Sequence, residues 1–324
     1  MFIVNQFNDK GVEASEQGKP ILPGYTQGGF IASRQADYDL VEIIKQNDTK
    51  LKGYVVKSKG ALRQTFYLEN YYNDYLNGDT VQDISSRIIL GIERTKMDKD
   101  EVINIFSSFE DVKEFLRVGL VSTELNVDFL EDKPFMKMGD VTVVFYVCFR
   151  EDEDGNIPIS WITNKLKDSW SINLCDLYST AIRNSMREDK AVLMSMQDAM
   201  FKMTVGAPYQ CMNLLSDDVP LDPEDMYVLT NKSKNRGAAV ILYEGVLSNV
   251  ADRMRVDVLY IIPSSIHEVI VLSGLKCSEK RVCTELEEMI RSINETEVSH
   301  EEILGNRPLI YRRKDDRICS MSEI

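Results

Sequence analysis

Residues 259–272, LYIIPSSIHEVIVL, give the strongest structural signal in the sequence. Two runs, LYII and VIVL, are apolar at every position, which is typical of strands covered on both faces. Between them lie Pro263, Ser264 and Ser265, residues whose ring and hydroxyls favour a turn. The stretch therefore predicts a buried β-hairpin whose tip carries the polar residues.

A helix is predicted soon after this hairpin, within SEKRVCTELEEMIRSI, because its apolar residues recur every three or four positions. The same plan, a hairpin followed by a one-sided helix, occurs three times along the chain. These units are predicted near 38–94, 140–187 and 257–294. Adjacent hairpins that are each covered by a helix indicate an α+β fold, with antiparallel sheets and helices packed on them.

Several further elements are expected from shorter patterns. A helix is predicted from about Lys99 to Leu116, where apolar residues follow a 3.6-residue period. MYVLT and AAVILY are apolar runs on either side of the turn NKSKNRG, and RPLIYRRKDDR predicts a last edge strand. Ser299, followed by Glu302, fits a capping box, which predicts His300 at an exposed helix start.

The distribution of glycine, proline and acidic residues predicts the domain boundaries. Residues 1–37 contain GKPILPGYTQGG and are expected to form an irregular arm. An N-terminal α+β domain is predicted at 38–205, and a C-terminal α+β domain at 226–324. The acidic, proline-containing segment 206–225 between them is expected to be a linker.

Charge limits the classes of partner. The chain has 324 residues and a formal net charge of −14. Nonspecific nucleic-acid binding depends on Lys and Arg that displace counterions from phosphates, so this composition excludes it. The acidic balance is instead typical of a soluble protein that is kept apart from others by charge repulsion.

Localisation is predicted from the cysteines and from the lack of targeting patterns. The six cysteines are spread without a CxxC pair, which is typical of reduced thiols. The start MFIVNQFNDKG has no signal-peptide pattern, and no apolar run reaches about 18 residues. We expect a cytoplasmic protein that does not enter a membrane.

The hairpin tip also carries the catalytic candidates of the chain, Ser264, Ser265, His267 and Glu268. A nucleophilic serine needs a histidine within hydrogen-bond reach and an acid that orients the ring. Neighbouring residues of a strand point to opposite faces, however, so His267 and Glu268 on a return strand would not share a pocket. The hairpin is therefore preferred as a structural element, and catalysis by these residues is kept as an alternative.

Other candidate sites are weaker. The acidic tip 151–155 resembles a calcium loop, but the register places Arg150 and Trp161 where liganding carboxylates are needed. In NKSKNRG, Lys232, Lys234 and Arg236 could receive an anion on exposed amides, although a basic turn without a ligand is preferred. A methionine-rich stretch at 186–212 is interpreted as a helix packed into the core, in preference to a groove that binds an apolar partner. With two histidines and scattered cysteines, neither a metal nor a cofactor is expected.

Three stretches of the chain carry a resemblance to a known family. TFYLENYYNDYLNG, MYVLTNKSKNRGAAVILYEGVL and LYIIPSSIHEVIVL occur in this order. The resulting pattern, YVLTN…GAAVILY…PSSIHEVI, resembles an uncharacterised family of Firmicutes proteins, a domain of unknown function common in gut Lachnospiraceae. The resemblance spans roughly 38–313. It implies a bacterial, cytosolic origin but supplies no reaction, cofactor or catalytic residue.

Because the fold signals agree with one another while the chemical signals fail on spacing, the preferred function is a non-enzymatic interaction or regulatory module. Its partner is expected to be a protein. One alternative is a hydrolase that uses Ser264 or Ser265 with His267 and an acid from elsewhere in the chain. Another alternative is an acidic protein that imitates nucleic acid.

Overall fold

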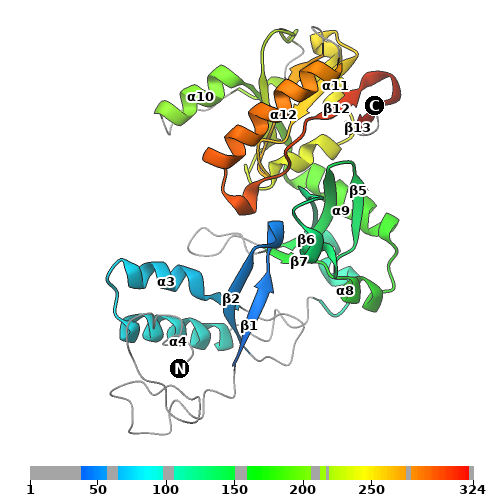
Figure 1. Cartoon of the computed structure of the whole chain (residues 1–324). Coiled ribbons are helices and arrows are strands. Elements are labelled where there is room, and N and C mark those ends of the chain that lie inside the picture. The colour runs from blue at the N-terminus through cyan, green and yellow to red at the C-terminus, as the bar shows by residue number, and fades with distance from the viewer. Residues whose placement is uncertain are drawn as a thin grey trace, which may run out of the picture. The chain divides into compact units, whose positions relative to one another are not determined.

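The computed structural model describes residues 38–56, 65–97, 106–149, 159–205, 212–216, 219–274 and 279–320. Two compact units make up the chain, and Figure 1 shows their elements. The first consists of Met1–Lys45 and Lys50–Asp111. The second consists of Gln46–Thr49 and Val112–Ile324. Each is described by itself below.

The first unit contains a three-stranded antiparallel sheet in the order β1-β2-β3. The strands are β1 (Tyr38–Ile44), β2 (Lys50–Val56) and β3 (Thr65–Tyr67), and the helices are α3 (Leu68–Leu76) and α4 (Val81–Met97). Thr80 begins α4, since its hydroxyl accepts the Asp83 N–H at 3.2 Å. Ile84 and Ile88 are buried one turn apart, as the period predicts.

The second unit begins with a sheet centred on β6 (Val141–Cys148), which is buried along nearly its whole length. Strands β4 (Leu116–Ser122), β5 (Phe135–Met138) and β7 (Ile159–Trp161) all pair with β6 in antiparallel register. The helices of this part are α6 (Phe109–Val112), α7 (Val127–Leu130), α8 (Asn164–Ser169) and α9 (Leu174–Glu188). Asn173 caps α9, as expected, by accepting the Asp176 N–H at 2.8 Å.

A six-stranded antiparallel sheet in the order β13-β12-β10-β11-β9-β8 forms the rest of the second unit. Its strands are β8 (Ala191–Ser195), β9 (Tyr227–Asn231), β10 (Val258–Ile262), β11 (Val269–Ser273), β12 (Leu309–Arg312) and β13 (Arg317–Cys319). The helices are α10 (Met196–Val205), α11 (Val246–Met254) and α12 (Glu279–Thr296). Short 3-10 segments are η3 (Leu214–Ser216), η4 (Gly237–Leu242), η5 (His300–Glu302) and η6 (Arg313–Asp315). The hairpin β10–β11 lies at the centre of this sheet, because apolar residues on both its faces require cover.

The predicted α+β class, the antiparallel sheets and the plan of hairpin followed by helix are confirmed. Two shorter expectations are wrong. Leu116 begins strand β4, so no helix runs through it, and the β-branched residues Val118 and Val121 favour that strand. The apolar run AAVILY, which has no predicted geometry, lies in η4 up to Leu242. Strand β12 pairs on both sides, and the edge is β13.

The contacts divide the chain near residue 111, whereas the sequence predicts a linker at 206–225. Strand β8 precedes this segment and β9 follows it, and the two strands pair along their whole length. Whether 206–225 separates two domains stays a prediction. The predicted arm 1–37 and the acidic tip 151–155 lie outside the described residues. Among the described residues, no helix is long and apolar enough to cross a membrane.

Candidate functional site

The four catalytic candidates lie in the loop between β10 and β11. Strand β11 begins at Val269, so His267 and Glu268 precede it, and the alternation of strand faces does not separate them. The loop is held by its own backbone, since the Ser264 N–H donates to Ile262 O at 2.9 Å and the Ser265 N–H to Glu268 O at 3.1 Å. The four residues are close in the chain, but their hydrogen bonds serve the loop.

Both ring nitrogens of His267 have neighbours. Nδ1 accepts the backbone N–H of Arg236 at 3.2 Å, so the proton of the neutral ring lies on Nε2. Nε2 lies 3.5 Å from Glu302 Oε1. The Ser265 hydroxyl oxygen accepts the His267 N–H at 3.0 Å. Within the described part of the chain, no hydrogen bond joins the imidazole to the hydroxyl of Ser264 or Ser265.

The loop of His267 is joined to the loop that follows β9, about thirty residues earlier. The Thr230 hydroxyl donates to His267 O at 2.8 Å, and the Ala238 N–H donates to Ile266 O at 3.2 Å. Gly237 makes this approach possible, because a Cβ there would lie 2.5 Å from His267 O. Two stretches that are separate in the sequence, NKSKNRG and PSSIHE, therefore form one structural unit.

Arg236 is the central residue of this unit. It has a left-handed backbone, with φ 53°. Its guanidinium carbon lies 4.7 Å from the ring centre of Trp161 and 5.7 Å from that of Tyr146, distances typical of cation–π contacts. The residue as a whole is half-buried, but its Nη1 atom is shielded from solvent and has no hydrogen-bond partner in the described structure. Burial lowers the pKa of the guanidinium below its ordinary value.

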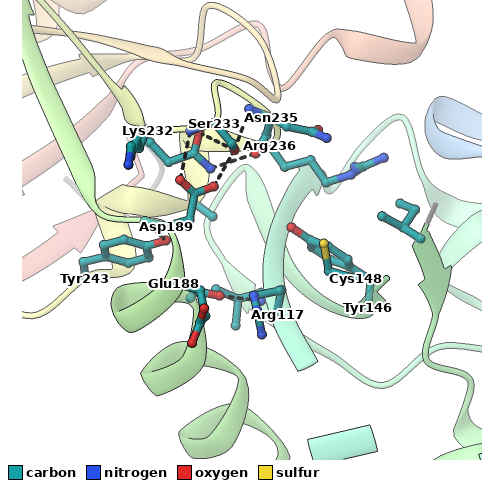
Figure 2. Close-up of a pocket in the computed structure, with 15 residues that line it drawn as sticks. Arg117, Tyr146, Cys148, Glu188, Asp189, Lys232, Ser233, Asn235, Arg236 and Tyr243 are labelled. Atoms are coloured by element: carbon teal, nitrogen blue, oxygen red, sulfur yellow. Dashed lines mark hydrogen bonds between the residues drawn. The ribbon is translucent and has the colours of Figure 1, made fainter. Parts of the chain in front are cut away.

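One side of Arg236 faces a cavity of about 340 Å³, which Figure 2 shows. Its walls are formed by Arg117, Val118, Tyr146, Cys148, Ile159, Ser185, Glu188, Asp189, Asn231, Lys232, Ser233, Asn235, Arg236, Ala239 and Tyr243. In Figure 2 the Arg236 side chain extends away from Asp189 towards the side on which Tyr146 and Cys148 lie. We call this space the first cavity.

The acidic groups of the first cavity are engaged with other residues. Asp189 accepts the Ser233 N–H at 2.9 Å and also the Ser233 hydroxyl. Glu188 pairs with Arg187 at 2.6 Å, and this contact lowers the pKa of Glu188. The remaining charges of the wall are Arg117, Lys232 and Arg236. Three cations and two carboxylates therefore line the first cavity, within a chain of net charge −14.

Tyr146 forms a buried wall of the first cavity, and burial raises its pKa to about 12. A raised pKa stabilises the fold below the unfolded value near 10, and this contribution is lost as the pH rises towards 12. We expect the free energy of unfolding to fall by about 2–3 kcal/mol more over this range in the native chain than in Tyr146→Phe. Urea unfolding from pH 9 to pH 12 measures the difference. Parallel pH profiles for the two proteins would contradict the expectation.

A second cavity of about 550 Å³ also reaches Arg236. Its walls are formed by Gln46, Thr49, Arg236, Ile266, His267, Ser299, His300, Glu301 and Glu302. Both histidines of the chain line it. In addition to Arg236 Nη1, two other buried atoms of this wall, Gln46 Nε2 and Thr49 Oγ1, lack a hydrogen-bond partner in the part of the chain that is described.

His300 begins a 3-10 helix and is exposed, as predicted. Ser299 does not cap it through its side chain, since the Ser299 carbonyl accepts the Glu302 N–H instead. His300 Nε2 lies 3.1 Å from Asn47 O, and a carbonyl only accepts, so Nε2 is the donor. The sequence did not suggest this contact, which joins residues 253 positions apart.

The basic turn at 232–236 is the part of the site that the sequence did indicate. Its anion-binding interpretation was set aside for lack of a phosphate-loop pattern, yet Lys232 and Arg236 line the first cavity. Gln46, Thr49 and Trp161 were not candidates. Among the residues that the structure describes, no three His, Cys, Asp or Glu side chains group as metal ligands would.

Fold and site together define an α+β protein in which a buried arginine lies between two cavities. The chain belongs to the family of unknown function DUF5688, whose model matches residues 29–313. No curated protein and no solved structure matches the chain in the comparisons.

Proposed function

We propose that the protein is a non-enzymatic, cytosolic interaction module that recognises an acidic group through Arg236. The observation that carries this proposal is the state of the guanidinium. It is packed on Trp161, one of its nitrogen atoms is buried without a hydrogen-bond partner, and among the described carboxylates Glu302 attracts it without forming an ion pair.

A buried charge without a partner is costly, because desolvation is only partly offset by the aromatic rings. The cost is recovered when an anion arrives, since a guanidinium in a water-poor site forms short, paired hydrogen bonds with carboxylate or phosphate oxygens. Its contact with the rings holds the planar group in place before binding, so little freedom is lost. Arg236 is thus prepared for an acidic ligand.

Charge around the first cavity supports the same proposal. Arg117 and Lys232 stand on its wall with Arg236, while Glu188 and Asp189 are engaged by neighbours. The cations concentrate at one place in an acidic chain, which directs an anion to that place. The acidic group can belong to a protein partner or to a small molecule, and the resemblance to a bacterial family favours a cytosolic setting.

The hydrolase alternative receives less support from the geometry. A serine nucleophile needs an imidazole nitrogen that accepts its proton. In His267, Nδ1 accepts from Arg236 and Nε2 faces Glu302, while the Ser265 oxygen accepts the His267 N–H. The loop uses these groups to hold its shape. No observation favours the nucleic-acid mimic.

Fluorescence of Trp161 tests the proposal directly. In a Trp170→Phe background Trp161 is the single tryptophan, and it lies against the guanidinium. We expect acetate and inorganic phosphate, titrated at constant ionic strength, to give a saturable change in its emission. Arg236→Met should abolish this change, because it keeps a long apolar side chain on the ring but removes the charge. Lys234→Gln, an exposed neighbour outside both cavities, should leave it intact.

Stability provides the control for this experiment. Exchanging an unpaired buried charge for an apolar group is often neutral or stabilising by about 1–2 kcal/mol. We therefore expect Arg236→Met to unfold at the same or a higher urea concentration than the native chain. A large loss of stability would mark Arg236 as a structural residue and overturn the proposal. Equal anion titration in Arg236→Met, or no saturation with either probe, would overturn it too.

A further inference from the structure

We propose that the second cavity binds a small zwitterion, of which a free amino acid is the simplest case. The carboxylate of the ligand lies at Arg236, Gln46 and Thr49, and its ammonium group lies at Glu301 and Glu302. This inference rests on the proposed function in one respect, that Arg236 receives the acidic group. It adds the side from which the ligand binds and the chemical class to which it belongs.

Hydrogen-bond donors on the residues that line this cavity indicate where the carboxylate binds. Buried polar atoms in native proteins nearly always have a hydrogen-bond partner, and those that lack one need an explanation. Gln46 Nε2, Thr49 Oγ1 and Arg236 Nη1 are buried and lack a partner among the described residues, and the three residues that carry them line the same cavity. Gln46 is 8% exposed. Two nitrogen donors and a hydroxyl are what a carboxylate accepts from.

The segment that supplies two of these donors is held firmly, so it is prepared for binding. Asn47 lies between Gln46 and Thr49, and its Nδ2 donates to His300 O at 2.6 Å and to Ile303 O at 2.8 Å. Its backbone N–H donates to Asn126 Oδ1 at 2.7 Å. The neighbours of the donors are thus fully satisfied, while the donors themselves are left for another molecule.

The carboxylates among the lining residues decide the class of ligand. Glu301 and Glu302 line the cavity, and Glu302 is half-exposed with its Oε1 3.5 Å from His267 Nε2. One guanidinium and two carboxylates make the cavity unfavourable for a phosphate or another multiply charged anion. A molecule with a negative and a positive end is matched by both kinds of charge in the lining. An amino acid carries these two ends one carbon apart.

The size and lining of the cavity agree with this class. A space of about 550 Å³ lies within the range of about 300–1,000 Å³ that small-molecule sites occupy. Ile266 adds an apolar side chain to the lining. Besides the two charged ends, the cavity therefore accommodates an amino-acid side chain.

Calorimetric titration of the full chain with each of the standard L-amino acids tests the inference. We expect saturable binding of at least one amino acid, and weaker binding of acetate or methylammonium, because each of these presents only one of the two charges. Thr49→Val and Glu302→Gln should each weaken binding about tenfold or more, which corresponds to one charge-assisted hydrogen bond. Glu297→Gln, exposed and outside the cavity, is the matched control.

The outcomes separate this inference from the proposed function. If acetate and phosphate bind through Arg236 but no amino acid binds, the zwitterion site is wrong and the module stands. Amino-acid binding that Thr49→Val and Glu302→Gln leave unchanged would place the ligand elsewhere, and the inference would fall. If Arg236→Met changes neither the anion titration nor the amino-acid titration, both the proposed function and the zwitterion site are wrong. Because Thr49→Val conserves volume and Glu302 is half-exposed, both variants are expected to fold.

Discussion

Gly237→Ala is expected to lower the free energy of unfolding of the second unit by about 3 kcal/mol or more, at the upper end of overpacking effects. A Cβ at this position would lie 2.2 Å from Thr230 Oγ1, 2.5 Å from His267 O and 2.7 Å from Asn231 N. Two of these neighbours are backbone atoms, which do not rotate away. The loops of Arg236 and His267 must therefore separate, and the first and second cavities lose their common wall.

Tryptophan fluorescence during urea unfolding measures this loss, because Trp161 and Trp170 both belong to the second unit. Gly305→Ala is the matched control. Its Cβ would lie 3.5 Å from Pro263 Cγ, an ordinary contact, so its stability should stay within about 0.5 kcal/mol of the native value. Equal unfolding of the two variants would mean that the two loops do not depend on their close approach at Gly237.

Asn126→Ala is expected to cost about 3 kcal/mol or more, because each buried polar group that loses its partner costs about 1–3 kcal/mol. Asn126 is fully buried. Its Oδ1 accepts the Asn47 N–H at 2.7 Å, and its Nδ2 donates to Asn47 Oδ1 at 2.6 Å and to Ser122 O at 2.8 Å. Removing the amide leaves three groups unpaired within the protein.

A double-mutant cycle with Asn47→Ala gives the coupling between the two side chains. Since they share two hydrogen bonds, the double variant should be more stable than the sum of the single losses predicts, by about 1–3 kcal/mol. Asn173→Ala, which removes an exposed helix cap, provides a reference loss of about 1 kcal/mol. Additive losses in the cycle would show that Asn47 and Asn126 act independently.

The hydrogen bonds of Asn47 matter for the proposed site as well as for stability. Asn47 fixes Gln46 and Thr49 against the carbonyls of His300 and Ile303. Asn47→Ala should therefore weaken ligand binding in the second cavity although Asn47 does not line it. Neither asparagine was a candidate in the sequence, since NDTK indicates only a polar turn.

The α+β class and most of the strands and helices could be predicted from the amino-acid sequence. Hairpins and one-sided helices are local features, and their periods can be followed over ten to twenty neighbouring residues. The same local reasoning predicts the end of a helix where β4 begins and gives AAVILY no definite geometry, because short apolar runs fit either geometry once they are buried.

The candidate site could not be predicted in this way, because its residues come together only in the folded chain. Arg236 meets Trp161 and Tyr146 from a different sheet, Asn47 meets His300 across 253 positions, and Gln46 and Thr49 join a wall formed near residue 300. A turn with three basic residues has the same local pattern whether its arginine is solvated or buried. The difference lies in what covers the side chain, and the covering residues are brought by long-range packing that no local period records.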